Sequence, residues 1–344
     1  MSLRLLFFCG ALSACVALAG CRHAPAPIAP VASAASPATA ANTAPVLLSN
    51  AELAKFKPNE AGVVPILEYH AIDNGKSTMS RSAAQFRRDL QRVYDEGYRP
   101  VSLSEYLDNR INLPAGKSPV IFSFDDARPT QFSYRPDGAI EPDCAVRILQ
   151  DFHQKHPDFA LKGVFFVLPT APGFGAVAVR QKKMQELLQM GFEIGNHTIH
   201  HDKLRDLTDE QVQRELADCV IEIHKLVPDA KVDTLALPYG IHARNRALES
   251  AGASAGQKYA NRAVLAVGAE PAPSPASKKF NPLRLPRIQA CEGPSGITYW
   301  LDDLKRHPQR RYISDGDPGI ITAPQSKANT VETSRLQGSR LRTY

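Results

Sequence analysis

The sequence predicts an α/β fold, a closed or nearly closed and distorted β/α barrel of about seven strands. Short apolar runs of strand length alternate with amphipathic helical patterns between residues 61 and 320. This alternation is typical of a parallel sheet covered by helices, and seven or eight such units in this length favour a barrel over an open doubly wound sheet. No Gly-rich phosphate loop follows the first run, which argues against a dinucleotide-binding fold.

The expected strands are continuous apolar runs, as strands buried on both faces require. They lie at residues 63–67, 120–124, 164–168, 192–194, 234–237, 264–267 and 285–288.

Helical patterns separate many of these runs. Phe86, Leu90 and Val93 recur at the spacing of one helix face, and Ser102 with Glu105 forms a capping box before the next helix. Further along, Pro142 suits a first helical turn, Gly191 suits a helix C-cap, and Thr208 with Gln211 opens a long helix. Each pattern predicts a helix packed outside the sheet.

The first 60 residues read as a targeting segment and a tether. Residues 1–20 combine a basic start with a short apolar stretch, as in a signal peptide, and Leu18-Ala19-Gly20-Cys21 resembles a bacterial lipobox. We expect Cys21 to be lipidated, so that the protein is exported and held on a membrane. Arg22 suggests the periplasmic face of a Gram-negative outer membrane, with the cell surface as the alternative. The Ala/Pro-rich residues 21–60 are expected to form the tether, and the basic residues 321–344 a disordered tail.

Composition excludes several classes of protein. Of 344 residues, 43% are hydrophobic and 22% charged, as in an ordinary globular protein, and the net charge of +6 is scattered along the chain. Nucleic-acid readout would need a clustered basic face, so no nucleic-acid partner is expected. The sequence implies no protein partner. Cys144, Cys219 and Cys291 would remain after export. Three cysteines allow at most one disulfide, and Cys144 and Cys219 suit buried helical positions.

Two polar clusters carry the candidate chemistry. Asp125 and Asp126 directly follow a buried strand, at the end where active sites of β/α barrels assemble. His197 and His201 are four residues apart, which on a helical turn would put both rings on one face. Each cluster alone has an ordinary structural explanation, a capping turn or a His-rich surface loop. Together they offer two imidazoles and a carboxylate, a suitable set for a hydrolytic metal ion.

These segments resemble the polysaccharide deacetylases of the NodB-homology type, carbohydrate esterase family 4. Residues 64–70, Val-Pro-Ile-Leu-Glu-Tyr-His, look like that family's opening strand, and residues 123–127, Ser-Phe-Asp-Asp-Ala, like its T-F-D-D-G motif. Residues 197–201 fit H-[ST]-x-x-H, and residues 238–240, Pro-Tyr-Gly, fit the end of R-x-P-x-G. The resemblance covers nearly all of residues 61–290 and implies that a catalytic domain occupies about residues 61–320.

The resemblance also implies a role for each matching residue. Asp125 would be the general base, and Asp126, His197 and His201 would bind one divalent metal ion, with zinc as the expected ion. Tyr239 would offer its backbone N–H to the oxyanion.

The sequence departs from the family pattern at three points, and the first is Ala127 in place of the glycine of T-F-D-D-G. Ala236 occupies the position of the arginine that orients the base, and Leu285-Pro286-Arg287 stands where the family has the L-x-H of its general acid. His70 and His242 are the remaining candidates for the acid, although a buried structural histidine explains His70 equally well.

The expected function is metal-dependent N-deacetylation of an acetylated polysaccharide at the cell envelope, with N-acetylglucosamine in peptidoglycan or a poly-N-acetylglucosamine-like polymer as the target. Two alternatives remain: a metal-dependent O-acetyl esterase acting on an envelope glycan, and a catalytically degenerate glycan-binding lipoprotein. The missing arginine and the missing late histidine motivate the second alternative.

Overall fold

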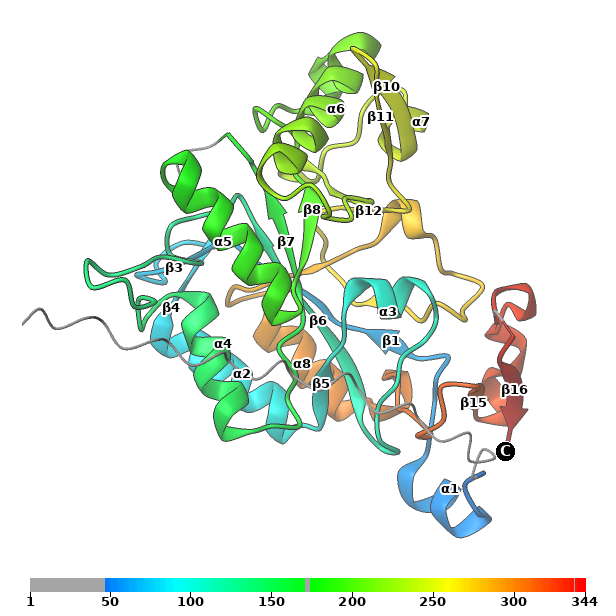
Figure 1. Ribbon diagram of the computed structural model, residues 1–344. Coiled ribbons are helices and arrows are strands. Elements are labelled where there is room, and N and C mark those ends of the chain that lie inside the picture. The colour runs from blue at the N-terminus through cyan, green and yellow to red at the C-terminus, as the bar shows by residue number, and fades with distance from the viewer. Residues whose placement is uncertain (1–46, 171–173, 337) are drawn as a thin grey trace, which may run out of the picture. The chain divides into compact units, whose positions relative to one another are not determined.

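The computed structural model describes residues 47–170, 174–336 and 338–344 (Figure 1), all within one unit spanning Pro45–Tyr344. The predicted signal peptide, the lipidation site Cys21 and most of the predicted tether lie outside the described residues. In the ranges given, no helix is long and apolar enough to cross a membrane.

The centre of the fold is a curled parallel sheet, which confirms the predicted barrel type. Its strands run in the order β12-β9-β8-β7-β6-β2-β14, and β5 pairs with β6. Their bounds are β2 Ile66–Tyr69, β5 Tyr98–Pro100, β6 Ser118–Asp125, β7 Val164–Val167, β8 Glu193–Asn196, β9 Thr234–Ala236, β12 Ala263–Leu265 and β14 Ile288–Gln289.

One segment joins the two edges of this sheet. Leu285 donates its N–H to Val264 and accepts from Ala266 beside β12, at 2.9 Å each. Three residues later, Ile288 pairs with Leu67 of β2. The expected strand at 285–288 is therefore a bent connection that nearly closes the barrel.

Side-chain alternation along the strands separates the outer core from the barrel interior. On β6, Phe122 and Phe124 belong to the outer core under the helices, and Ile121 belongs to the inner one. The same alternation aims Ser123 and Asp125, at the carboxyl end of β6, at the interior of the barrel.

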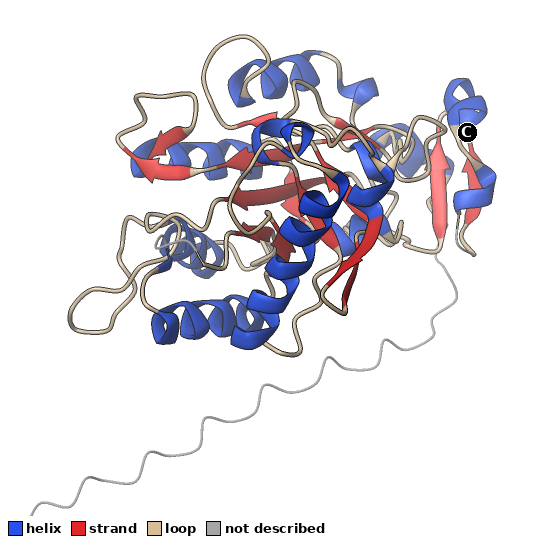
Figure 2. Ribbon diagram, turned by 90° about the horizontal axis from the view of Figure 1, so that it is seen from above, coloured by secondary structure: helices blue, strands red, loops and turns tan. Residues whose placement is uncertain are grey.

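Helices cover the outer face of the sheet, as Figure 2 shows. The capping boxes at Ser102 and Thr208 and the left-handed C-cap at Gly191 all form as predicted. Helices α2, α4, α5 and α8 contribute to the largest core, and α6 packs on β9 and β12. Their bounds are α1 Asn50–Phe56, α2 Ala83–Asp95, α3 Leu103–Leu107, α4 Ala145–Lys155, α5 Val177–Met190, α6 Asp209–Leu226, α7 Ala247–Ser250 and α8 Ile297–Arg306.

Besides the central sheet, the described chain forms short two-stranded sheets. They pair β1 with β13, β3 with β4, β10 with β11 and β15 with β16. Their bounds are β1 Val63–Val64, β3 Ala71–Asp73, β4 Ser80–Ser82, β10 Ala251–Ser254, β11 Gln257–Ala260, β13 Ala272–Pro273, β15 Ile320–Ala323 and β16 Arg340–Thr343.

Both predicted chain ends require correction. The expected disordered tail at 321–344 instead contains β15 and β16, and Val331 and Leu336 are buried in a small core with Ile321. The predicted tether also extends too far, because α1 begins at Asn50 and Glu60 is buried. Sequence composition missed these segments because their few apolar residues pack on distant partners.

The three cysteines of the described chain are all free. Cys144 and Cys219 are buried, as expected, and Cys291 is partly exposed. Cys144 precedes α4 as its N-cap residue, and Cys219 lies within α6.

Glu60 anchors the C-terminal segment from inside the protein. Its side chain accepts hydrogen bonds from the Tyr312 hydroxyl at 3.1 Å and from the Thr322 N–H at 2.8 Å. Burial, together with the nearby Asp315 carboxylate, raises the pKa of Glu60 well above its usual value. The folded state therefore binds the Glu60 proton more tightly than the unfolded chain does.

This linkage predicts how stability changes with pH. The contribution of protonated Glu60 should be complete below the unfolded pKa near 4.5 and should be lost as pH rises through the raised folded value. Melting temperatures of wild type and Glu60→Gln, measured from pH 4 to 9, should therefore diverge in favour of the variant as pH increases. A difference that stays constant across this range would contradict the assignment.

Candidate functional site

The site begins where β6 ends. Asp125 points into the barrel and is almost fully buried, and the chain then turns through two left-handed residues, Asp126 with φ 76° and Ala127 with φ 52°. A left-handed backbone costs an L-residue about 1–2 kcal/mol, which explains why glycine suits the position of Ala127. This turn aims the two neighbouring carboxylates at different partners.

Asp126, His197 and His201 converge on one point. Asp126 Oδ1 lies 3.3 Å from Nε2 of His197 and 3.3 Å from Nε2 of His201. Four-coordinate zinc with bonds near 2.0–2.1 Å holds neighbouring ligand atoms roughly 3.3 Å apart. The spacing of these atoms therefore fits a tetrahedral metal ion.

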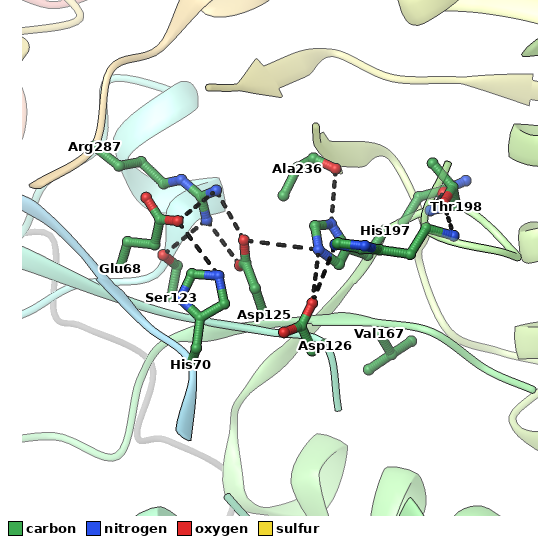
Figure 3. A network of polar contacts seen from close by, with 12 residues as sticks. Glu68, His70, Ser123, Asp125, Asp126, Val167, His197, Thr198, Ala236 and Arg287 are labelled. Carbon is green, nitrogen blue, oxygen red and sulfur yellow. Dashed lines mark hydrogen bonds and ion pairs between the residues drawn. The ribbon is translucent and has the colours of Figure 1, made fainter. Parts of the chain in front are cut away.

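The hydrogen bonds around the three residues leave the converging atoms free. His197 Nδ1 contacts the Ala236 carbonyl at 2.9 Å, so Nδ1 carries the proton and Nε2 keeps its lone pair (Figure 3). Arg128 holds the other oxygen of Asp126, with Nη2 2.9 Å from Oδ2. Within the described chain, Asp126 Oδ1 and His197 Nε2 are buried without a hydrogen-bond partner. Such orphaned atoms are expected of metal ligands.

The histidine segment brings the rings together without a helix. Residues 197–201 form an irregular turn, so the expected helical turn is wrong although its two ligands do converge. Thr198 with φ 67° and His201 with φ 62° are left-handed, and they bend the chain back on itself. His200 points away from the three ligands and pairs with Glu215 at 2.6 Å.

Sequence reasoning missed Arg287 as a site residue. Its guanidinium binds both oxygens of Asp125 at 2.8 Å, Nη1 to Oδ1 and Nη2 to Oδ2, and its side chain is fully buried (Figure 3). Arg287 thus supplies Asp125 with the cation that the resemblance led us to expect at position 236, where Ala236 stands. An arginine inside the otherwise apolar run at 285–288 was the signal that could have revealed it.

Arg287 also influences the pKa values of the two carboxyl groups beside it, Asp125 and Glu68. Burial would raise the pKa of Asp125, but Arg287, His197 and His70 more than offset this and hold that pKa below its usual value. Glu68, which is 3.5 Å from Arg287, responds differently: burial raises its pKa to about 7. One buried cation therefore keeps Asp125 ionised beside a second carboxyl group that readily takes a proton.

His70 belongs to the same cluster, at the end of β2. Its Nε2 is 3.6 Å from Glu68, and its carbonyl accepts a hydrogen bond from Gln131, which also donates to the carbonyl of Asp125. Burial lowers the pKa of His70, opposed by the carboxylates of Asp125 and Asp126. Gln131 thus ties together the ends of the two strands that carry His70 and Asp125.

Of the two remaining candidates, Tyr239 lies beside His201, whereas His242 has a different partner. His242 is engaged by Glu249 at 2.7 Å, and none of its hydrogen bonds in the described chain reaches the cluster. Tyr239 sits in the short 3₁₀ segment Pro238–Gly240 with φ 58°, and its exposed ring lies 4.7 Å from the ring of His201. In the described residues, the N–H of Tyr239 has no acceptor, so it is free to bind one.

The geometry predicts a metal site at Asp126, His197 and His201. Purified apo protein should bind one equivalent of Zn²⁺, and His201→Ala should weaken binding by more than about 100-fold, because one of three ligands is lost. The neighbouring variant His200→Ala is the matched control and should bind nearly as wild type. Competition with a chromophoric chelator measures both affinities, and equal losses in the two variants would argue against this ligand set.

Removing Arg287 should destabilise the fold. Arg287→Gln should lower the free energy of unfolding by about 3–5 kcal/mol, because the buried Asp125 carboxylate loses its cation. Adding Asp125→Asn should recover part of that loss. Urea denaturation measures each variant, with the exposed Arg284→Gln as a control expected within about 0.5 kcal/mol of wild type. An Arg287→Gln variant as stable as this control would refute the buried ion pair.

Comparison with known proteins agrees with this architecture. Residues 113–260 match the family model for polysaccharide deacetylases. YxkH of Bacillus subtilis (strain 168), which bears the provisional name of polysaccharide deacetylase, is 26% identical over 169 residues. The match covers 48% of this chain and 53% of YxkH, about half the length of each.

Two solved structures share the fold. The deacetylase PplD of Streptococcus pyogenes, solved in complex with acetate, is 20% identical with a TM-score of 0.51, covering 71% of this chain and 97% of PplD. The polysaccharide deacetylase BC0361 of Bacillus cereus is 19% identical with a TM-score of 0.50, covering 71% and 68%. These similarities establish the curled parallel sheet.

Proposed function

Since the chain carries a polysaccharide deacetylase domain, we propose that it is a metal-dependent N-deacetylase acting on a polysaccharide that contains N-acetylglucosamine. The observation that carries this proposal is the convergence of Asp126, His197 and His201, with Asp125 Oδ2 only 3.9 Å from His197 Nε2. Metal-assisted amide hydrolysis needs a metal ion with an open coordination position and a base beside it, and a three-ligand site next to a carboxylate can provide both.

Asp126, His197 and His201 would hold the ion, which we propose to be zinc. Bound there, the metal would supply Lewis acidity, polarising the acetyl carbonyl and lowering the pKa of water. The free Nε2 atoms of both histidines and Oδ1 of Asp126 are the ligand atoms, while Arg128 keeps the other oxygen of Asp126 occupied. Arg128 thus restricts Asp126 to a single ligating oxygen.

Asp125 is assigned as the general base. Its pKa, held below the usual value chiefly by Arg287 against the effect of burial, keeps it ionised and ready to accept the proton of the attacking water. Arg287 binds both of its oxygens and so limits the orientations that the carboxylate can adopt. Tyr239 N–H, which has no acceptor in the described chain, would donate to the oxyanion that develops on the acetyl carbonyl.

His70 is the better candidate for the general acid. It lies in the same buried cluster as Asp125, whereas His242 is committed to Glu249. Burial lowers the pKa of His70, and the carboxylates of Asp125 and Asp126 oppose this by favouring the protonated ring that would donate to the departing amine. In these roles Arg287 and His70 would fill the two gaps that motivated the alternative of a degenerate glycan-binding protein.

The location of the substrate follows from the predicted lipid anchor. We propose that Cys21 is lipidated and that the domain acts at the cell envelope, on peptidoglycan or a poly-N-acetylglucosamine-like polymer. The motif Leu18-Ala19-Gly20-Cys21 supports this location, and an anchored enzyme suits an insoluble glycan.

The test is release of amine and acetate from a panel of acetylated glycans. Wild type should release both in equal amounts, chelation should abolish release, and Zn²⁺ should restore it. Asp125→Asn and His70→Ala should each lower kcat by about 10²–10⁴-fold, because each removes a proton-transfer group. His242→Ala is the matched control and should stay within about twofold of wild type.

Other outcomes would favour the alternatives. Acetate without free amine, from O-acetylated glycan, would indicate an O-acetyl esterase. Glycan binding with neither product would indicate a binding protein, and equal losses in His70→Ala and His242→Ala would remove the basis for choosing His70 as the acid.

A further inference from the structure

The turn between the two histidine ligands holds an unfavourable backbone. Thr198 and His201 both have positive φ, 67° and 62°, and a β-branched residue such as Thr198 is rarely found there. Such a conformation persists only when surrounding contacts stabilise it. The positions of His197 and His201 therefore depend on whatever holds this turn.

Glu215 of helix α6 makes the contacts that hold the middle of the turn. Its Oε2 accepts from the backbone N–H of Ile199 at 3.2 Å and from that of His200 at 3.0 Å. Its Oε1 binds the His200 ring at 2.6 Å. Glu215 is only 6% exposed, so this carboxylate is buried against three donors and is not an ordinary surface ion pair.

The remaining contacts tie the same turn to the same helix. Asn196 accepts from the N–H of Thr198 at 2.8 Å and donates to the carbonyl of Leu216 on α6 at 2.9 Å. The hydroxyl of Thr198 accepts from the N–H of His201 at 2.9 Å. The ligand-bearing turn is thus attached to α6 through Glu215 and through Asn196.

We propose that Glu215 is a positioning residue for the metal site, acting through the backbone N–H groups of Ile199 and His200 to keep His197 and His201 in their converging arrangement. Glu215 does not touch the ligand atoms themselves. The proposal rests on the metal site of the proposed function, and it assigns α6 the role of setting the spacing of two ligands before any metal binds.

The test is metal affinity measured on the full chain. Glu215→Gln should weaken Zn²⁺ binding by about 10–100-fold, the range typical of residues that orient ligands. The d–d absorption spectrum of the Co²⁺ form should also change, because the ligand geometry shifts. Glu210→Gln is the matched control, since Glu210 is exposed on the same helix, and it should bind as wild type.

Two further comparisons isolate the backbone contacts. His200→Ala leaves both N–H bonds to Glu215 intact and should stay within about twofold of wild type. If Glu215→Gln fails to fold, Glu215→Asp should also lose affinity, because it keeps the carboxylate but shortens its reach to the N–H groups of Ile199 and His200.

Three results would overturn the proposal: wild-type affinity and an unchanged Co²⁺ spectrum in a folded Glu215→Gln, a loss in His200→Ala as large as in Glu215→Gln, or wild-type affinity in a folded Glu215→Asp. These failures are separate from failure of the proposed function. A wild type that binds Zn²⁺ through this turn but releases no amine would refute the deacetylase alone.

Discussion

The ion pair between Arg287 and Asp125 is the interaction on which the interior of the barrel depends. Both side chains are buried, and a buried carboxylate without a cation is strongly unfavourable. Arg287 comes from the segment that connects β12 to β2, so the same residues that nearly close the barrel also neutralise its central acid. Closure of the sheet and ionisation of Asp125 are therefore coupled.

Backbone strain is concentrated at the carboxyl end of the sheet. Of nine non-glycine residues with positive φ in the described chain, five lie at the candidate site: Asp126, Ala127, Thr198, His201 and Tyr239. These residues bend the chain in the segments that follow β6, β8 and β9. Strain of this kind persists where packing and hydrogen bonds over-determine the geometry, as Glu215 and Asn196 do for the histidine turn.

Local sequence patterns were sufficient to predict much of the fold. Apolar runs located the central strands, and the capping boxes at Ser102 and Thr208 located two helix starts, because both signals depend on neighbouring residues. The C-terminal segment escaped prediction because its order depends on Glu60, more than 250 residues earlier in the chain. Composition alone cannot reveal a contact of that separation.

The sequence by itself determined which residues could form the metal site, since Asp126, His197 and His201 stand in recognisable motifs next to strands. Only the tertiary structure decided which residues surround these three side chains. Arg287 reaches Asp125 across 162 positions, His70 rather than His242 joins the buried cluster, and α6 holds the ligand turn. A parallel sheet brings the ends of distant strands to one edge, so such partners are neighbours only after the barrel has folded.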